Sequence, residues 1–112
     1  MKLTHVNPSS VQKGIDLLDS KLPDWYERID LDQLDMANIN QCILGQIGQL
    51  FPVLGDYMLS GLEYLGIRKL SYSLSAYGFD VSHEAYSTNP EQAYGELLRY
   101  WIEVINERRN NR

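Results

Sequence analysis

The feature that most restricts the fold is a single apolar stripe near the end of the chain. Asn89, Pro90 and Gln92 form a helix start, with an N-cap residue, a proline at the first position and a capping-box glutamine. Two arginines follow the stripe in the last turn, where positive charge meets the negative end of a helix. The pattern predicts a helix from about Pro90 to Arg109, with an inward face formed by Tyr94, Leu97, Leu98, Trp101 and Ile105.

Prolines divide the first part of the chain into shorter segments. An N-cap at Ser9 or Ser10 and an apolar stripe that ends at Leu22-Pro23 predict the first helix, because a residue before proline disfavours helical geometry. Pro23 can also open a further helical turn, and residues 29–36 are predicted to be irregular. The inward positions of these two segments are Val11, Ile15, Leu18, Leu22, Trp25, Tyr26 and Ile29.

Two more helices are predicted in the middle of the chain. One follows an N-cap at Asn38 or Asn40 and closes at Phe51-Pro52, and the next lies between an N-cap at Asp56 and a left-handed Gly66. Residues 67–77 fit both a helix and a strand, and the glycine after them favours a helix. The apolar positions of the two helices are Ile43, Leu44, Ile47, Leu50, Phe51, Tyr57, Met58, Leu62 and Leu65.

Together these segments predict an all-α fold, a compact bundle of four to five helices with a short extended N-terminus. A chain of 112 residues has the size of one domain, so residues 1–112 are expected to form a single helical domain. No apolar stretch approaches the roughly 20 residues that span a bilayer, and the start of the chain lacks the apolar core of a signal peptide. The single cysteine, Cys42, excludes a disulfide within the chain, and a cytoplasmic protein is expected.

The formal net charge of −5 is concentrated early in the chain. Residues 16–35 contain seven acidic residues against two basic ones, whereas the remainder is balanced. Such a field attracts a basic partner and repels nucleic acid, so direct binding to nucleic acid is not expected. Trp25 and Tyr26 lie in the same stretch, and aromatic rings beside carboxylates are suited to a protein–protein interface.

No motif for catalysis, metal binding or cofactor binding accompanies this charge. The two histidines and Cys42 lack the spacing of metal ligands, and the acids from Asp30 to Asp35 lack the glycine and glutamate of a calcium loop. An enzyme would have to gather distant groups, such as His83 with Asp56 or Glu84. We therefore expect a non-enzymatic protein that uses no metal or cofactor.

Six short motifs are spread along the chain from Glu27 to Arg109. They are Glu27-Arg28-Ile29-Asp30-Leu31-Asp32-x-Leu34-Asp35-Met36, Cys42-Ile43-Leu44-Gly45-Gln46, Gly55-Asp56-Tyr57, Gly61-Leu62-x-x-Leu65-Gly66, Tyr77-Gly78-Phe79-Asp80 and Leu98-x-x-Trp101-x-x-x-Ile105-x-x-Arg108-Arg109. In this pattern the chain resembles an uncharacterised family of small proteins from actinobacterial phages and their hosts. The resemblance implies an accessory protein of a phage or prophage, a class that often inhibits host proteins, and it implies no catalytic residue.

These observations predict a non-enzymatic protein that binds and inhibits a host protein, as an anti-CRISPR or another anti-defence protein does. The partner is expected in the host cytoplasm, with nucleic-acid-binding proteins among the candidates. Binding is predicted to use an acidic surface flanked by aromatic rings. The residues predicted to form this surface are Asp24, Trp25, Tyr26, Glu27, Asp30, Asp32 and Asp35.

Two other functions remain open from the sequence. The first is a protein that binds or sequesters a small molecule such as a nucleotide, because five of the eight glycines lie between Gly45 and Gly66 and tyrosines are abundant. These glycines do not form a phosphate-binding loop, and close helix packing explains Gly45 and Gly48 better. The second is a structural helper whose helices pair with copies of the same chain, which makes a homo-oligomer the other alternative.

Overall fold

The computed structural model describes residues 6–67 and 71–111, and every regular element within them is a helix. The all-α prediction is therefore confirmed. Four helices have eight or more residues and three are shorter, so the described chain has more helices than the four or five expected. The helices are α1 (Pro8–Lys21), α2 (Trp25–Arg28), α3 (Ile43–Leu50), α4 (Tyr57–Leu65), α5 (Ser71–Ala76), α6 (His83–Thr88) and α7 (Pro90–Asn110).

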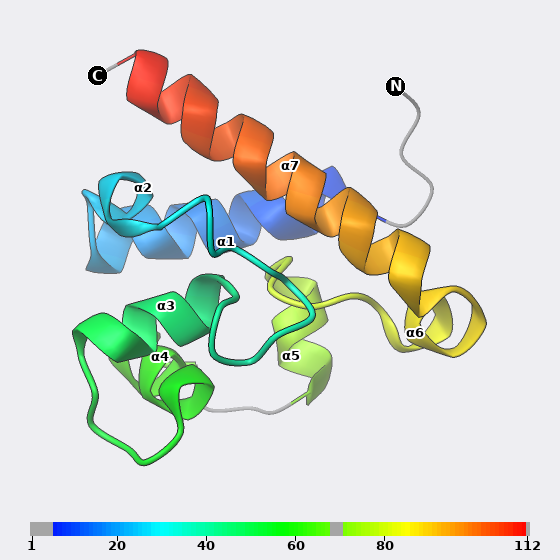
Figure 1. Ribbon diagram of the computed structural model, residues 1–112, viewed down its shortest axis with the longest axis horizontal. Helices are drawn as coiled ribbons and strands as arrows, with labels where there is room; N and C mark the ends of the chain where they lie inside the picture. Colours follow the sequence, from blue (N-terminus) through cyan, green and yellow to red (C-terminus); the bar gives the residue numbers. More distant parts are fainter. Residues whose placement is uncertain (1–5, 68–70, 112) are drawn as a thin grey trace.

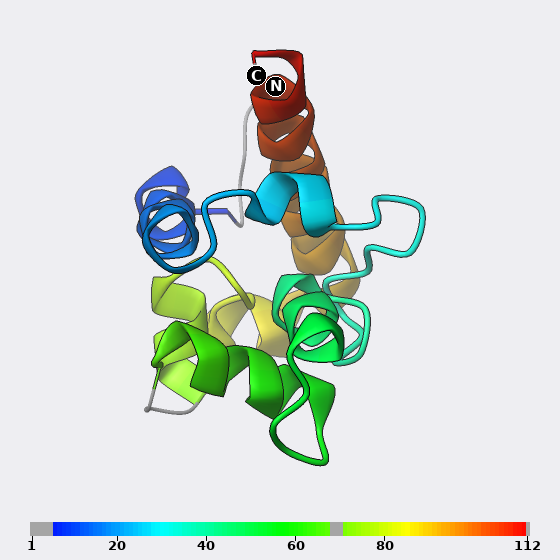
Figure 2. The same cartoon turned by 90° about the vertical axis from the view of Figure 1, so that its left-hand side faces the viewer.

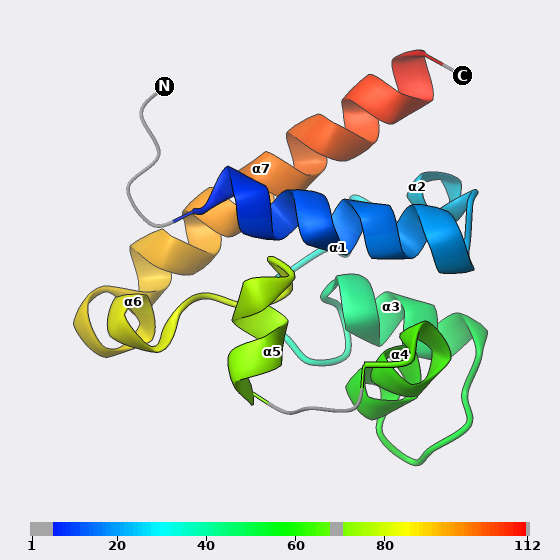
Figure 3. The same ribbon diagram turned by 180° about the vertical axis from the view of Figure 1, so that it is seen from behind.

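The long helix α7 crosses α1 on one side of the molecule (Figure 1). The view from behind shows α1 in front of α7, with α5 and the α3–α4 pair on the other side of α1 (Figure 3). Helix α2 packs against α7, while α1 contacts α4 and α5. The buried apolar residues of all these elements form one continuous cluster. The predicted extended N-terminus lies mostly outside the described residues.

The strongest sequence predictions concern helix ends, and they are confirmed. Helix α7 begins at Pro90, and the Asn89 side chain accepts a hydrogen bond from the backbone N–H of Gln92 at 3.4 Å. Asp56 caps α4 by accepting from the Leu59 N–H at 3.0 Å. Gly66 ends α4 in the left-handed conformation that a residue without Cβ adopts at low cost.

Two predicted N-caps are wrong. Helix α1 is capped by Asn7, whose side chain accepts from the Ser9 N–H at 2.9 Å, and not by Ser9 or Ser10. Helix α3 is capped by Cys42, because the Asn38 side chain accepts from the Asn40 N–H and closes a turn before the helix. The Cys42 sulfur accepts from the Gly45 N–H at 3.3 Å, and burial raises the pKa of this thiol.

Helix α5 confirms the choice of helix over strand for its residues, whereas residues 68–70 of the predicted segment lie outside the described part of the chain. Helix α6 was not predicted from the sequence. It begins where Ser82 accepts a hydrogen bond from the Ala85 N–H at 3.1 Å. Ala85 is its only buried residue, so α6 lacks the apolar stripe by which a helix is recognised in a sequence.

Large aromatic side chains fill the space between α1, α2 and α7. Trp25 and Trp101 are both fully buried, and their rings meet edge to face with centroids 5.8 Å apart. Phe79 stacks on the other side of Trp101 at 5.7 Å. The indole nitrogen of Trp101 donates to the Gly78 carbonyl at 2.7 Å, and that of Trp25 donates to Asp19 at 2.9 Å. Buried indoles therefore keep the hydrogen bonds that they would make in water.

Helices α3 and α4 pack together through positions that lack a side chain. A Cβ atom at Gly48 would overlap the backbone carbonyl of Tyr57, and one at Gly61 would overlap the carbonyl of Leu44. A Cβ at Gly45 would overlap the backbone of the preceding loop at Ile39. The sequence interpretation that a missing side chain lets a neighbouring helix approach is confirmed for Gly48 and extends to Gly61, whereas Gly45 admits the preceding loop and not a helix.

Candidate functional site

The predicted acidic surface loses its tryptophan in the structure. Trp25 is 0% exposed, because its ring is enclosed by Trp101 and its indole N–H is bound by Asp19. The prediction that this ring is available to a partner is therefore wrong, although the expectation that it faces inward from its helical turn is right. A partner cannot reach Trp25 without opening the core.

Tyr26 is only half-buried, but the end of α7 covers much of it. The guanidinium carbon of Arg108 lies 5.8 Å from the centre of the Tyr26 ring. Arg109 donates to the Tyr26 carbonyl at 2.9 Å and to the Ile29 carbonyl at 2.6 Å. These contacts attach α2 to α7, so Tyr26 has the structural role of an inward position, whereas its contacts with the two arginines were not predicted.

Two of the early acids are paired with arginines. Asp19 forms a bidentate pair with Arg108, with distances of 2.9 and 2.8 Å, and its hydrogen bonds to this guanidinium lower the pKa of Asp19. Asp24 pairs with Arg28 at 3.1 Å within one helical turn. Their charges are locally compensated, so they contribute little to an attractive field for a partner.

The remaining predicted acids are exposed. Glu27 lies on α2, whereas Asp30, Asp32 and Asp35 lie on the connection from α2 to α3, which projects from the helices in Figure 2. Asp30 accepts from the Asp32 N–H at 2.9 Å, and Asp35 accepts from the Ala37 N–H at 3.0 Å. These bonds fix local turns and leave carboxylates at the surface.

A second exposed surface lies on the connection between α3 and α4. We call its four large side chains the apolar tip: Leu50, Val53, Leu54 and Tyr57, which are 40%, 62%, 48% and 41% exposed. The sequence predicted that Leu50 and Tyr57 face the core. They are exposed because they lie at the ends of α3 and α4, beside the connection, where the two helices no longer cover each other.

The apolar tip is held in place by one buried hydroxyl group. Ser60 is 0% exposed, and its oxygen accepts from the N–H groups of Val53 and Leu54 at 3.2 and 2.8 Å. The same hydroxyl donates to the Leu54 carbonyl at 3.1 Å. Three hydrogen bonds to a residue of α4 therefore fix the backbone of the connection while its side chains face solvent.

The chain segment that contains the apolar tip carries charge of one sign. Residues 29–67 contain five acidic residues and no lysine, arginine or histidine, whereas the other ten acids share the chain with all ten lysines and arginines. The formal charge of −5 is thus accounted for by the α3–α4 pair and the connection before it. A cationic partner is attracted to this side of the molecule.

An open groove of about 420 Å³ lies between the end of α2 and the end of α3. We call it the glutamine groove, because four of its lining residues are glutamines. The side chain of Gln46 lies in its wall, where it accepts a hydrogen bond from the Asp30 N–H at 2.7 Å and donates to the carbonyls of Asp30 and Gln41. Its lining residues are Arg28, Asp30, Gln33, Gln41, Gln46, Gln49 and Leu50.

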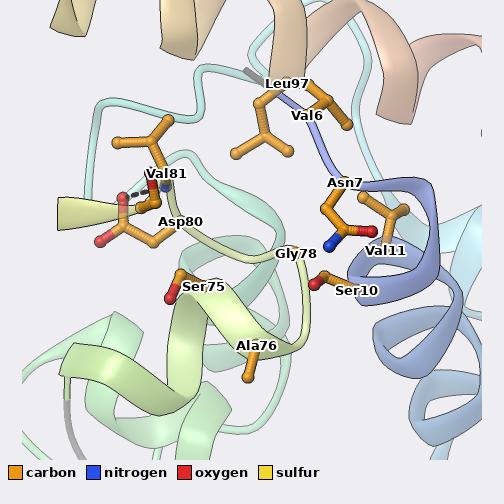
Figure 4. Close-up of a pocket in the computed structure, with 11 residues that line it drawn as sticks. Val6, Asn7, Ser10, Val11, Ser75, Ala76, Gly78, Asp80, Val81 and Leu97 are labelled. Carbon is orange, nitrogen blue, oxygen red and sulfur yellow. Dashed lines mark hydrogen bonds between the residues drawn. The ribbon is translucent and has the colours of Figure 1, made fainter. Parts of the chain in front are cut away.

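A smaller cavity of about 200 Å³ lies between the start of α1, the end of α5 and α7 (Figure 4). Val11, Val81 and Leu97 supply apolar walls, and Asp80 is among the polar groups. The Asp80 carboxylate already accepts hydrogen bonds from the Val81 N–H and from the Tyr94 hydroxyl. The pKa of Tyr94 is raised, mainly by burial and also by its hydrogen bond to Asp80. None of the clustered glycines that suggested a small-molecule site lines this cavity.

The candidate enzyme residues His83 and Asp56 are not brought together, whereas Glu84 is the neighbour of His83 on α6. His83 lies in α6 and Asp56 at the start of α4, in different parts of the molecule (Figure 1). Within residues 6–67 and 71–111, no three histidine, cysteine or carboxylate side chains are grouped closely enough to hold a metal ion. None of the helices in this part of the chain combines the length and apolar character needed to cross a membrane.

Comparisons with family models, with curated proteins and with solved structures give no match for this chain.

The sequence contained one overlooked signal for the apolar tip. Only Val53 and Leu54 stand between Pro52 and Gly55, which is too few residues for a helix, and two large apolar residues in a short connection are unusual. Their exposure was therefore open to prediction, whereas the role of Ser60 was not.

Proposed function

We propose that this chain is a non-enzymatic protein that binds another protein through the apolar tip. The observation that carries the proposal is the exposure of four large apolar side chains, two on the short α3–α4 connection and two at the helix ends that flank it. Large apolar side chains that gather close together in the sequence and stay exposed indicate a surface for a partner, because they gain no stability from contact with water. Its burial in an interface supplies the favourable free energy of association.

The rigidity of the connection supports the same proposal. A mobile loop loses conformational entropy when it binds, and fixing its backbone costs about 1–2 kcal/mol for each residue that becomes ordered. Here Ser60 already fixes the backbone at Val53 and Leu54. Most of the backbone ordering cost is therefore met during folding, which favours tight binding by a small surface.

In its more specific form, the proposal includes the inhibitory role that the sequence predicts. In that form the partner is a host protein, and the protein blocks it as an anti-CRISPR or other anti-defence protein would. The support is electrostatic: a negative surface competes with nucleic acid for a cationic site. The acids that support it are Asp30, Asp32 and Asp35, in place of the wider set that included Trp25.

The test uses a photo-crosslinking amino acid at Val53 in cells of the source organism. Tyr86 is the matched control, because it is an exposed apolar residue, at 58%, on the distant helix α6. We expect a discrete crosslinked adduct from position 53 and none of the same mass from position 86. Mass spectrometry of the adduct then identifies the partner.

A change of Leu54→Ser should abolish the adduct at position 53 while leaving the far-UV circular dichroism spectrum unchanged. Equal crosslinking from positions 53 and 86, or an adduct that is insensitive to Leu54→Ser, would contradict the proposal. Inhibition is measured separately, by competition between this protein and nucleic acid for the purified partner.

A further inference from the structure

We propose that the glutamine groove receives a basic segment of the partner protein in an extended conformation. This inference rests on the proposed function and names the chemistry of the bound partner. Leu50 belongs both to the apolar tip and to the lining of the groove, so the two form one continuous surface. A partner anchored on the tip therefore extends into the groove.

The sign of the partner's charge follows from the charges beside the groove. Asp30 lines it, and Asp32 and Asp35 are exposed on the same connection. The cation in the lining, Arg28, is paired with Asp24 at 3.1 Å, which compensates its charge. A lysine or arginine side chain in the groove thus meets the carboxylate of Asp30, with Asp32 and Asp35 on the same connection and no strong competing cation in the lining.

The same charges oppose a second copy of this chain as the occupant. A symmetric dimer through this surface would bring two regions together that each carry five acidic residues and no basic residue. Like charges at an interface cost free energy, and the cost grows as water is excluded. The apolar tip is therefore a surface for a different, cationic protein.

The extended conformation follows from the glutamines. Gln46 is occupied by three hydrogen bonds to the backbone of the connection, and Gln49 donates to the Asn40 carbonyl at 2.6 Å. The side-chain amides of Gln33 and Gln41 form no hydrogen bond within the described part of the chain. A side-chain amide offers a hydrogen-bond donor and an acceptor, which match the free peptide groups of an extended segment. The peptide groups of a helix are already hydrogen-bonded to each other.

The test selects binders from a displayed library of random nonapeptides on the intact protein, at about 150 mM salt. We expect the selected peptides to be enriched in lysine and arginine and to contain an apolar residue. Synthetic copies should bind the triple variant Asp30→Asn, Asp32→Asn and Asp35→Asn at least tenfold more weakly. Asparagine keeps the oxygen that accepts the backbone N–H in the turns, so the connection stays folded.

The matched control is the triple variant Glu84→Gln, Glu91→Gln and Glu103→Gln, which removes the same charge from exposed positions on α6 and α7. Binding to it should stay within twofold of the unchanged protein. Selected peptides without basic enrichment, or equal losses in the two triple variants, would overturn the inference. So would self-association that Leu54→Ser abolishes, because the occupant would then be a second copy.

These outcomes are separate from those of the crosslinking test. An adduct with a partner at position 53, together with peptides that lack basic residues, would retain the proposed function and remove the basic segment. Absence of any adduct at position 53 would remove the proposed function itself.

Discussion

The α1–α7 side and the α3–α4 side of the molecule differ in the residues that are most prominent in their packing. Between α1, α2 and α7 the space is filled by the largest side chains, Trp25 and Trp101. Between α3 and α4, Gly48 and Gly61 place backbone against backbone at two points. One side is stabilised by aromatic burial and the other by the close approach of two helices.

The two sides also differ in charge. At the end of α7, Arg108 and Arg109 are bound to Asp19 and to backbone carbonyls of α2. Residues 29–67 contain no such cation, and their surface keeps both its carboxylates and its apolar tip exposed. We infer that the α1–α7 side mainly provides stability and that the α3–α4 side is free to serve recognition.

The largest expected effect is on the aromatic side. Trp101→Ala removes a fully buried ring that contacts Trp25 and Phe79, and it leaves the Gly78 carbonyl without its partner. We expect a loss of about 3–5 kcal/mol in the free energy of unfolding, the range for large aromatic truncations in a core. Urea denaturation measures it. A loss below about 1 kcal/mol would mean that this region does not dominate the stability.

The glycine packing is tested by adding a single methyl group. Gly61→Ala would place its Cβ against the Leu44 carbonyl, so α3 and α4 must move apart, with an expected loss of about 1–3 kcal/mol. Gly95→Ala is the control, because Gly95 lies inside α7 with no atom within 4 Å of the added Cβ. That variant should gain about 0.5–1 kcal/mol from helix propensity. Changes of the same sign in the free energy of unfolding of the two variants would contradict the comparison.

A smaller and more local effect is expected from Ser60→Ala. The change removes three hydrogen bonds between α4 and the α3–α4 connection, and the released N–H groups of Val53 and Leu54 can reach water. We expect a loss of about 1 kcal/mol in global stability. Amide hydrogen exchange at Val53 and Leu54 should accelerate while the exchange of α7 stays unchanged. Unchanged exchange at these two amides would show that the hydroxyl does not fix the connection.

The smallest effect concerns the Asp19–Arg108 pair. Both side chains are more than one-third exposed, so solvent screening limits the loss from Asp19→Asn to about 0.5–1 kcal/mol at pH 7. Arg108 lowers the pKa of Asp19 in the folded protein. The stabilisation is therefore complete above the ordinary carboxyl pKa of about 4 and is lost as the pH falls through the lower folded value.

Urea denaturation of both proteins between pH 7 and pH 2 measures this dependence. The difference between the unchanged protein and Asp19→Asn should shrink below pH 4. Asp16→Asn, one turn earlier on α1, removes the same charge but no hydrogen bond to Arg108, and it serves as the control. A difference that is independent of pH would show that the charge of Asp19 is not involved.

The sequence predicted the fold class and the helix ends best where the signal is local. Asn89 and Pro90 define the start of α7 by themselves, and Gly66 ends α4 through its own backbone preference. The cap of α3 was missed because a cysteine sulfur is a weak acceptor that is seldom considered for this role. Helix α6 was missed because a short helix with one buried residue has no periodicity to detect.

The candidate site was less predictable, because burial depends on residues that are distant in the sequence. The residues of the short helix α2 do not determine whether Trp25 is exposed. Its ring is covered by Trp101, which lies far away in the sequence. Likewise, Asp19 is compensated by Arg108, which no spacing rule connects to it. The sequence predicted a negative protein and contained a signal for the exposure of Val53 and Leu54, whereas the exposure of Leu50 and Tyr57 at the helix ends required the structure.

The buried thiol that caps α3 has a practical consequence for the side of the molecule that we assign to recognition. Cys42 is the single cysteine of the chain, and its sulfur is enclosed at the point where α3 begins. A bulky maleimide can reach it only during transient opening of that first turn, so the alkylation rate of the unmodified protein reports how often the turn opens. Slower alkylation on addition of a ligand would show that the ligand suppresses this opening, without any engineered label.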